Sequence, residues 1–122
     1  NRIRNPKNLT TFAQEAACGA LSDVQYMWDY VAEVHEAMKQ FAGDMLKHSN
    51  EFKVLPSYGN FMMLRFPDYE KKKELLDYLA ENNIFARDTT QADCVRNCFR
   101  ITIGTREQMK RVAKVIDSFY GK

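Results

Sequence analysis

The sequence feature that most constrains the fold is a stripe of apolar residues between positions 24 and 45. Its members recur every three or four positions, which places their side chains on one face of an α-helix. The intervening positions are mostly charged or amide residues, as expected for a face in water. We therefore predict one long amphipathic helix over roughly residues 23–47. The stripe consists of Val24, Met27, Trp28, Val31, Val34, Met38, Phe41, Ala42 and Met45.

Three pairs of side chains mark predicted helix starts. A hydroxyl residue followed three positions later by Glu or Gln can satisfy two amide groups that the first turn of a helix leaves unpaired. This spacing predicts an Ala-rich first helix, then the long helix, and finally a helix at the C-terminus. The pairs are Thr11 with Gln14, Ser22 with Gln25, and Thr105 with Gln108.

Four short segments have the alternation or the β-branched and aromatic content of strands. The order of elements is two helices, then β, β, α, β, β, α. This order predicts an α+β fold, with a small antiparallel or mixed sheet of about four strands covered by helices. We assign residues 1–47 to a helical link and residues 48–122 to an α/β sandwich, within one domain. The predicted strands are Phe52–Leu55, Phe61–Phe66, Ile84–Arg87 and Phe99–Ile103, and the helix between the two strand pairs begins at Asp68.

Composition argues against several classes of function. The 122 residues include 18 Lys and Arg against 16 Asp and Glu, so the net charge of +2 is too small to favour nucleic acid as a partner. No apolar run approaches the roughly 18 residues that cross a bilayer, so we expect no membrane association. The three cysteines match no zinc or redox spacing, and we expect free thiols, a cytoplasmic location and no metal site.

Arg100 is the first candidate for a binding role. In the predicted strand Phe99–Ile103, alternation places the aromatic and isoleucine side chains on one face and Arg100 on the other. An arginine there either forms an ion pair at the sheet surface or directs its planar guanidinium toward a carboxylate or phosphate. Arg87 is followed by Asp88, and a local turn or an ion pair with that carboxylate is its simplest interpretation. Spacing alone leaves both alternatives open and favours the structural one for each arginine.

The remaining polar candidates have ordinary structural interpretations. His35 lies near the apolar stripe of the long helix, where a partly buried histidine is more common than a catalytic base. The run Lys71–Lys73 predicts a solvated helix face. Cys94 and Cys98 are predicted to be free thiols. No nucleophile, phosphate-binding loop or other catalytic motif is recognisable in the sequence.

The segment Phe-Arg-Ile-Thr-Ile-Gly-Thr-Arg-Glu at residues 99–107 resembles the closing signature of a known enzyme family. It is similar to the class I/II, fold-type-I pyridoxal-phosphate aminotransferases, and particularly to their histidinol-phosphate aminotransferase branch. Three further segments agree with that family in the same order, so the resemblance covers nearly the whole chain. They are Asn5–Ala17, Ser57–Phe61 with its Ser-x-x-Asn-Phe pattern, and Ile84–Asp88, which ends in Arg-Asp.

The resemblance implies roles for three residues of this chain. Arg100 would bind the α-carboxylate of the amino-acid substrate through a bidentate contact. Arg87, which precedes it by 13 positions, would hold a distal phosphate or acidic group. Asn60, from the Asn-Phe pair, is a third substrate-binding candidate. For Arg100 and Arg87 the resemblance favours the binding interpretation over the structural one, and for Asn60 it leaves the two balanced.

The resemblance also implies that the chain is the C-terminal small domain of such an enzyme. In this family the lysine that binds pyridoxal 5'-phosphate covalently, and the residues around its ring and phosphate, belong to the large domain. No lysine here lies in the corresponding motif, so we expect no catalytic or cofactor-binding residue in this chain and no turnover by the chain alone. The expected partners are the large domain, an amino acid and a 2-oxo acid as substrates, and a second copy in a homodimer.

Two alternatives stay open. Within the same fold, a pyridoxal-phosphate decarboxylase that acts on a phosphorylated amino acid would use the same elements. In a different functional class, a free-standing effector-binding α+β module would also combine β-hairpins with covering helices. The size of the natural protein discriminates between these classes, because an enzyme would be much larger than this chain, whereas a free-standing module would occur alone.

Overall fold

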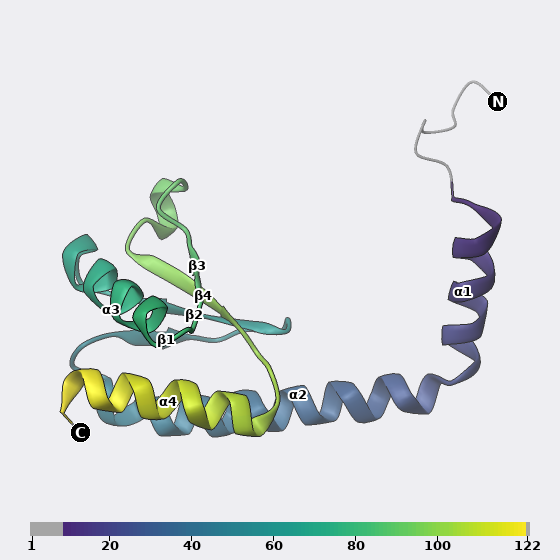
Figure 1. The fold of residues 1–122 in the computed structure, drawn as a ribbon, viewed down its shortest axis with the longest axis horizontal. Coiled ribbons are helices and arrows are strands. Elements are labelled where there is room, and N and C mark those ends of the chain that lie inside the picture. Colours follow the sequence, from purple (N-terminus) through teal and green to yellow (C-terminus); the bar gives the residue numbers. More distant parts are fainter. Residues whose placement is uncertain (1–8, 122) are drawn as a thin grey trace. The chain divides into compact units, whose positions relative to one another are not determined.

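The computed structural model describes residues 9–121, which divide between Ala32 and Glu33 into two compact units. The first unit contains α1 (Thr11–Ser22) and the beginning of α2 (Val24–Met45), and α2 continues into the second unit. Figure 1 labels both helices. The segment Asn5–Ala17, which carries part of the family resemblance, lies partly outside the described residues. Among residues 9–121, no helix is long and apolar enough to cross a membrane.

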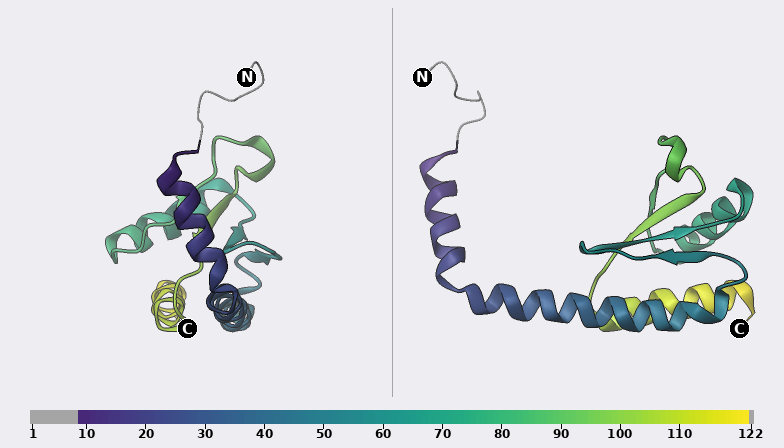
Figure 2. Two further views of the ribbon diagram at one scale, coloured as in Figure 1. Left: turned by 90° about the vertical axis from the view of Figure 1, so that its right-hand side faces the viewer. Right: turned by 180° about the vertical axis from the view of Figure 1, so that it is seen from behind.

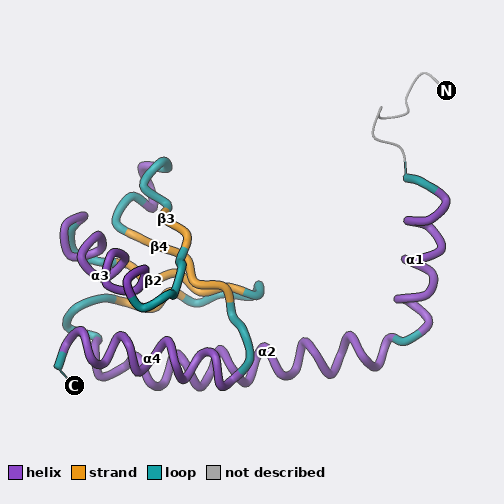
Figure 3. The backbone as a smooth tube through the Cα atoms, in the orientation of Figure 1, coloured by secondary structure: helices purple, strands orange, loops and turns teal. Residues whose placement is uncertain are grey.

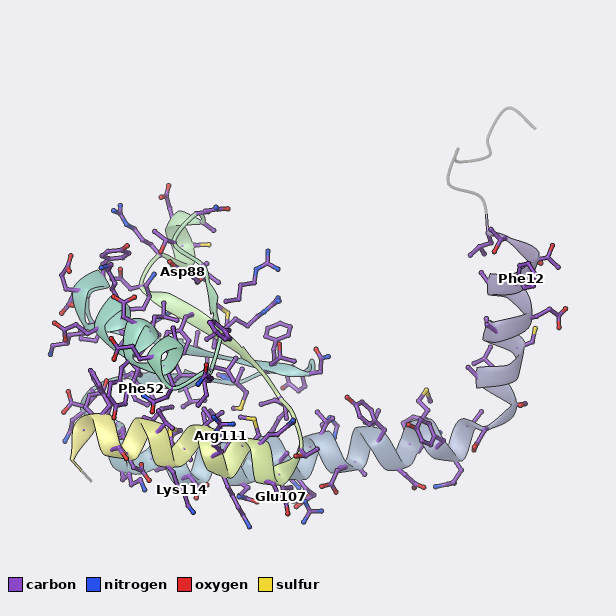
Figure 4. The ribbon with its side chains drawn as sticks, in the orientation of Figure 1. Phe12, Phe52, Asp88, Glu107, Arg111 and Lys114 are labelled. Atoms are coloured by element: carbon purple, nitrogen blue, oxygen red, sulfur yellow. The ribbon has the colours of Figure 1, made fainter. Side chains whose placement is uncertain are left out.

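The first unit has little burial of its own. No side chain of α1 is buried, and the exposed apolar residues include Phe12, labelled in Figure 4. On α2, Trp28 is 58% exposed. The predicted long helix is confirmed, but its apolar stripe is buried only in the second unit, at Val34, Ala37, Met38, Phe41 and Met45.

The second unit is built around one antiparallel sheet in the order β1-β2-β4-β3. Figure 3 shows its strands in orange and the helices in purple. This arrangement confirms the predicted α+β fold with four strands, all of them antiparallel. The strands are β1 (Lys53–Leu55), β2 (Phe61–Arg65), β3 (Arg87–Asp88) and β4 (Cys98–Thr102); the other elements of this unit are η1 (Leu46–His48), α3 (Tyr69–Glu81), η2 (Asp93–Val95) and α4 (Arg106–Tyr120).

One face of the sheet forms the core with the helices. Phe99, Ile101 and Ile103 are buried in the same cluster as side chains from α2, α3 and α4, as the strand alternation predicts. The α4 residues of that cluster are Met109, Val112, Ala113 and Ile116. Within this unit α2 and α4 lie side by side, which Figure 2 shows from the end and from behind. An ion pair with two contacts of 2.7 Å, from Arg106 to Glu33, joins them.

Two of the three predicted helix starts are wrong by one residue. Thr10, not Thr11, caps α1, because its hydroxyl accepts a hydrogen bond from the Ala13 amide at 3.2 Å. Asp23 takes the role predicted for Ser22, since its carboxylate accepts from the Tyr26 amide at 3.1 Å. Ser22 instead ends α1. Each start has two adjacent residues that can serve as caps, and the spacing rule does not discriminate between neighbours.

The third helix start is confirmed. Thr105 accepts a hydrogen bond from the Gln108 amide, and the Gln108 side chain accepts one from the Thr105 amide at 2.9 Å. Gly104 precedes this capping box, and a Cβ at that position would displace the Gln108 side-chain oxygen from it. The box fixes the path of the chain from β4 into α4.

The predicted strand Ile84–Arg87 is wrong over most of its length, because only Arg87 and Asp88 pair with β4. The preceding residues are used to leave α3. Asn83 adopts a left-handed conformation with φ of 58°, and the Ile84 amide donates to the Leu79 carbonyl at 2.9 Å. These contacts close the C-terminus of the helix, and the backbone pairs with β4 only from Arg87, three residues after Ile84.

Lys72 corrects the prediction that Lys71–Lys73 is a solvated face. Its side chain is fully buried beneath the loop between β3 and β4. Its ammonium group donates three hydrogen bonds: to the Asp88 carboxylate at 2.6 Å, the Thr90 hydroxyl at 2.5 Å and the Arg96 carbonyl at 2.9 Å. These are all the donors that a lysine has. Lys72 therefore ties α3 to β3 and to the loop that follows it.

The ends of α2 and α4 are joined by a second polar cluster. His48 is fully buried, and its Nε2 lies 2.7 Å from an Asp117 oxygen. Lys47 donates to the other Asp117 oxygen at 2.7 Å. Burial opposes ionisation of Asp117, but the hydrogen bonds from Lys47 and His48 outweigh it and hold the pKa of this carboxyl below its ordinary value. The folded state is thus stabilised by the ionised carboxylate.

We expect Lys72→Met to destabilise the fold by about 1 to 3 kcal/mol, because three hydrogen bonds of a charged group are lost while half-exposed Asp88 regains water. Urea unfolding measures this change. Lys71→Met is the matched control, since Lys71 is exposed on the same helix. Equal stability of the two variants would show that the buried ammonium does not secure the loop.

Acid should weaken the contact between α2 and α4. A carboxyl whose pKa is lowered by folding stabilises the folded state above its unfolded pKa, near 3.9, and loses that contribution as the pH falls through the folded value. Unfolding free energies measured from pH 6 down to pH 2.5 should therefore fall less steeply in Asp117→Asn than in the wild type. Asp77→Asn, which changes an exposed aspartate on α3, should keep the wild-type slope.

Candidate functional site

Arg100 and Arg87 are direct neighbours on the sheet. They are paired positions in the antiparallel register of β4 and β3, and Met63 of β2 is the partner of Arg100 on its other side. Paired residues project from the same face of a sheet. Because Phe99 and Ile101 face the core, both arginines lie on the opposite, outer face. Two cations 13 positions apart in the sequence are thus brought together by strand pairing.

The predicted ion pair between Arg87 and Asp88 is wrong. Neighbouring residues of a strand point to opposite faces, and Asp88, labelled in Figure 4, directs its carboxylate to Lys72. The pKa of Asp88 is lowered because the hydrogen bonds from Lys72 and Thr90 outweigh the opposing effect of burial. Among residues 9–121, no carboxylate lies within 4 Å of Arg87 or Arg100. The local structural interpretation of each arginine therefore has no partner in the structure.

The Arg100 side chain is partly buried and held in place by an aromatic ring. Its guanidinium carbon lies 4.8 Å from the centre of the Phe61 ring, a cation–π contact that also orients the planar group. Its Nε is buried and has no hydrogen-bond partner. A buried unsatisfied donor costs free energy unless a ligand or ion completes its hydrogen bonding. Arg100 thus has the features of a donor prepared for an anion.

The outer face of the sheet is cationic as a whole. Besides the arginine pair, Lys53 is the cross-strand partner of Arg65, so a second pair of like charges lies on this face. Directly opposed like charges are destabilising, and a bound anion would relieve both pairs. The strand residues of this face include four cations and no acid: Lys53, Leu55, Phe61, Met63, Arg65, Arg87, Cys98, Arg100 and Thr102.

Asn60 lies immediately before β2, at the end of the sheet beyond the pair Phe61 and Thr102. Its carbonyl accepts a hydrogen bond from the Ile103 amide at 2.8 Å, and its side chain is exposed. Asn60 therefore lies just outside β2, opposite Ile103 and three positions along the chain from the Arg100 position of β4, and no contact joins the side chains of Asn60 and Arg100. The structure brings Arg87 and Arg100 together as cross-strand partners, whereas Asn60 lies before β2, three positions from the Arg100 partner Met63.

The other candidates have different outcomes. His35 is exposed, which corrects the prediction of a partly buried histidine. Cys94 and Cys98 are both free thiols, as predicted. In the described part of the chain, no group of three His, Cys, Asp or Glu side chains could hold a metal ion. Sequence reasoning missed Phe61 as the platform for Arg100, although its place at the start of an alternating strand put it on the outer face.

Comparison of the sequence with known proteins identifies its family. The family of class I and II aminotransferases matches residues 1–116. A histidinol-phosphate aminotransferase of Aliarcobacter butzleri is 34% identical over 116 residues, which is 95% of this chain and 30% of that protein. The dihydroxyacetone phosphate transaminase Cj1437c of Campylobacter jejuni is 36% identical over 124 aligned positions, all of this chain and 32% of that protein.

A solved structure shares the fold. The histidinol-phosphate aminotransferase of Sinorhizobium meliloti, in complex with pyridoxal-5'-phosphate, superposes with a TM-score of 0.77 at 22% identity, over 97% of this chain and 33% of that one. The chain thus spans about a third of the length of the relatives it matches. From the extent of the family match and the identity to its members, the chain belongs to the class I and II aminotransferases.

Proposed function

We propose that this chain is the C-terminal small domain of a pyridoxal-phosphate aminotransferase, and that Arg100 and Arg87 bind the anionic groups of its substrate. The observation that carries the proposal is the cross-strand arginine pair without a carboxylate partner among the described residues. Structural arginines are paired with acids, whereas arginines that bind a ligand keep their donors free for it. Of the two arginines, Arg100 is the better supported as a binding residue, because it is partly buried and its Nε has no hydrogen-bond partner.

Arg100 would hold the substrate α-carboxylate. A guanidinium presents two parallel donors to a carboxylate, so the contact fixes the orientation of the amino acid as well as its position. The Phe61 ring contacts the guanidinium, whose carbon lies 4.8 Å from the ring centre. Positioning of this kind can contribute several kcal/mol to catalysis. The role of Arg100 is therefore to bind and orient the substrate.

Arg87 would take a second anionic group of the substrate, such as a distal phosphate. Arg87 is the cross-strand partner of Arg100, and its exposed side chain lies on β3, the edge strand of the sheet. The two relatives described above are named for phosphorylated compounds, histidinol phosphate and dihydroxyacetone phosphate, which supports a phosphorylated substrate. Asn60, the residue before β2, is a third candidate contact. The amino donor would be an amino acid and the acceptor a 2-oxo acid.

Pyridoxal 5'-phosphate, when bound, would supply the electron sink for chemistry at the substrate Cα. The buried lysine among the described residues of this chain is not available to bind this cofactor covalently. Lys72, the one buried lysine among them, has all three donors engaged with Asp88, Thr90 and the Arg96 carbonyl. We therefore assign the covalent site to a large domain that corresponds to the remaining two thirds of the relatives. The oligomeric state that we propose for the intact enzyme is a homodimer.

The decisive variant is Arg100→Lys in the intact protein. Lysine keeps the charge but offers a single point donor, so the loss of one charge-assisted hydrogen bond should lower kcat/KM about ten- to a hundredfold. The melting temperature should change little, because Arg100 lies on the face away from the core. A large fall in melting temperature with unchanged kcat/KM would make Arg100 structural. Release of carbon dioxide instead of 2-oxo acid would identify the decarboxylase alternative.

Arg87→Lys should affect substrates selectively. Its proposed contact lies beyond the α-carboxylate, so kcat/KM should fall about tenfold for a phosphorylated amine or amino acid and little for an unphosphorylated one. Steady-state kinetics with both substrates measure this ratio. Arg111→Lys is the control, since Arg111 is an exposed arginine on α4. Equal losses for both substrates would remove Arg87 from the distal site.

A further inference from the structure

We propose a second anion-binding site, separate from the Arg100 and Arg87 pair, in a pocket that takes a phosphate group between Arg65 and Arg96. The pocket has a volume of about 370 Å³ and lies where β2 ends and β4 begins. Its polar lining comes from Arg65, Asp93, Arg96 and Asn97, with the thiols of Cys94 and Cys98 beside them. Two guanidinium groups and an amide are donors suited to a tetrahedral anion with several acceptor oxygens.

The walls of this pocket are fixed by hydrogen bonds. The Phe66 amide donates to the Asn97 carbonyl at 2.9 Å, which joins the end of β2 to the loop before β4. The Thr89 hydroxyl contacts the carbonyls of Val95 and Cys98 at 2.8 and 2.7 Å. Buried Lys72 holds the Arg96 carbonyl. The pocket is therefore preformed, so a ligand would not have to order the loop first.

The lining of the pocket carries positive charge, which favours an anionic ligand. Arg65 lies opposite Lys53 in the sheet, a like-charge pair, and neither it nor Arg96 has a carboxylate within 4 Å among residues 9–121. Arg96 instead lies over the Tyr69 ring, with its guanidinium carbon 5.9 Å from the ring centre. Asp93 also lines the pocket and reduces the formal charge of the lining to +1, the sum of two arginines and one aspartate.

The pocket adjoins the arginine pair without being part of it. Cys98 and Arg100 are two residues apart on β4, so their side chains leave the same face about 7 Å from each other. Neither Arg100 nor Arg87 lines the pocket. The outer face of the sheet thus offers two neighbouring positions for negative charge, and the second does not depend on the assignment of the first.

Alkylation of Cys94 provides a test that needs no enzymatic activity. Cys94 is exposed and lines the pocket, whereas Cys18 is exposed on α1 and serves as the internal reference. Iodoacetamide modification of the intact protein is followed peptide by peptide, with inorganic phosphate added at constant ionic strength. We expect phosphate to slow the reaction of Cys94 several-fold and to leave Cys18 unchanged. Absence of selective protection overturns the proposal, as does equal protection by acetate.

Variants of the lining make the test specific. Arg96→Gln and Arg65→Gln should each weaken the phosphate dependence of protection about tenfold or more, and both side chains are exposed, so folding should be kept. Asp93→Asn should strengthen it, because the repelling charge is removed. Arg111→Gln should leave it unchanged. Protection that survives in Arg96→Gln and Arg65→Gln overturns the site.

Arg100→Lys separates the two proposals. If the pocket binds phosphate by itself, protection of Cys94 persists in this variant even though substrate use falls. Loss of protection in Arg100→Lys would show that the anion belongs to the arginine pair, and would overturn a second site. Conversely, normal substrate use in Arg100→Lys with intact protection would overturn only the proposed role of Arg100.

Discussion

The pairing of β2 with β4 is the interaction on which the rest of the structure depends. Its five paired positions place Leu64 opposite Phe99 in the core and Met63 opposite Arg100 on the outer face. Side chains alternate with a period of two, so a slip of one residue would bury Arg100 and expose Phe99. The hydrophobic demand of the core therefore sets the register. The same register determines where the cations of the outer face lie.

The outer face of the sheet brings positive charges close together, so contacts elsewhere must offset their repulsion. The strand β3 has only two residues, too few to maintain its own position opposite Arg100. Lys72 compensates, because its buried ammonium group binds Asp88 at the back of that strand and two groups of the following loop. A cation on the core side thus holds the backbone of β3, which carries Arg87, and the backbone of the loop at Arg96. Aromatic rings support the exposed guanidinium groups in place of carboxylates.

Under the proposed function, the two faces of the sheet have different roles in the enzyme. The core side of the sheet, with α2, α3 and α4, supplies rigidity. In that proposal the outer side supplies positive charge for anions, since its four strand cations, Lys53, Arg65, Arg87 and Arg100, lie outside the hydrophobic core. Substitutions of outer-face arginines should therefore affect ligand binding more than folding. Substitutions of Lys72 and Asp117 should do the reverse.

The sequence by itself determined those features that depend on neighbours along the chain. Alternation in residues 98–103 separated Arg100 from the core, the pair Thr105 and Gln108 located the start of α4, and the Arg-Ile-Thr-Ile-Gly-Thr segment pointed to the family. The long helix was also readable, because its stripe repeats over many turns. Caps were displaced by one residue where two adjacent residues could serve.

Only the tertiary structure decided the partners of the charged residues. Lys72 reads as one of three solvated lysines, yet it is buried because Asp88, Thr90 and the Arg96 carbonyl converge on it from 16 to 24 positions away. Asp88 reads as the partner of Arg87, yet strand geometry sends the two side chains to opposite faces. The pairing of Arg87 with Arg100 follows from strand register. Long-range contacts of this kind leave no periodic trace in the sequence, because each depends on where distant segments meet.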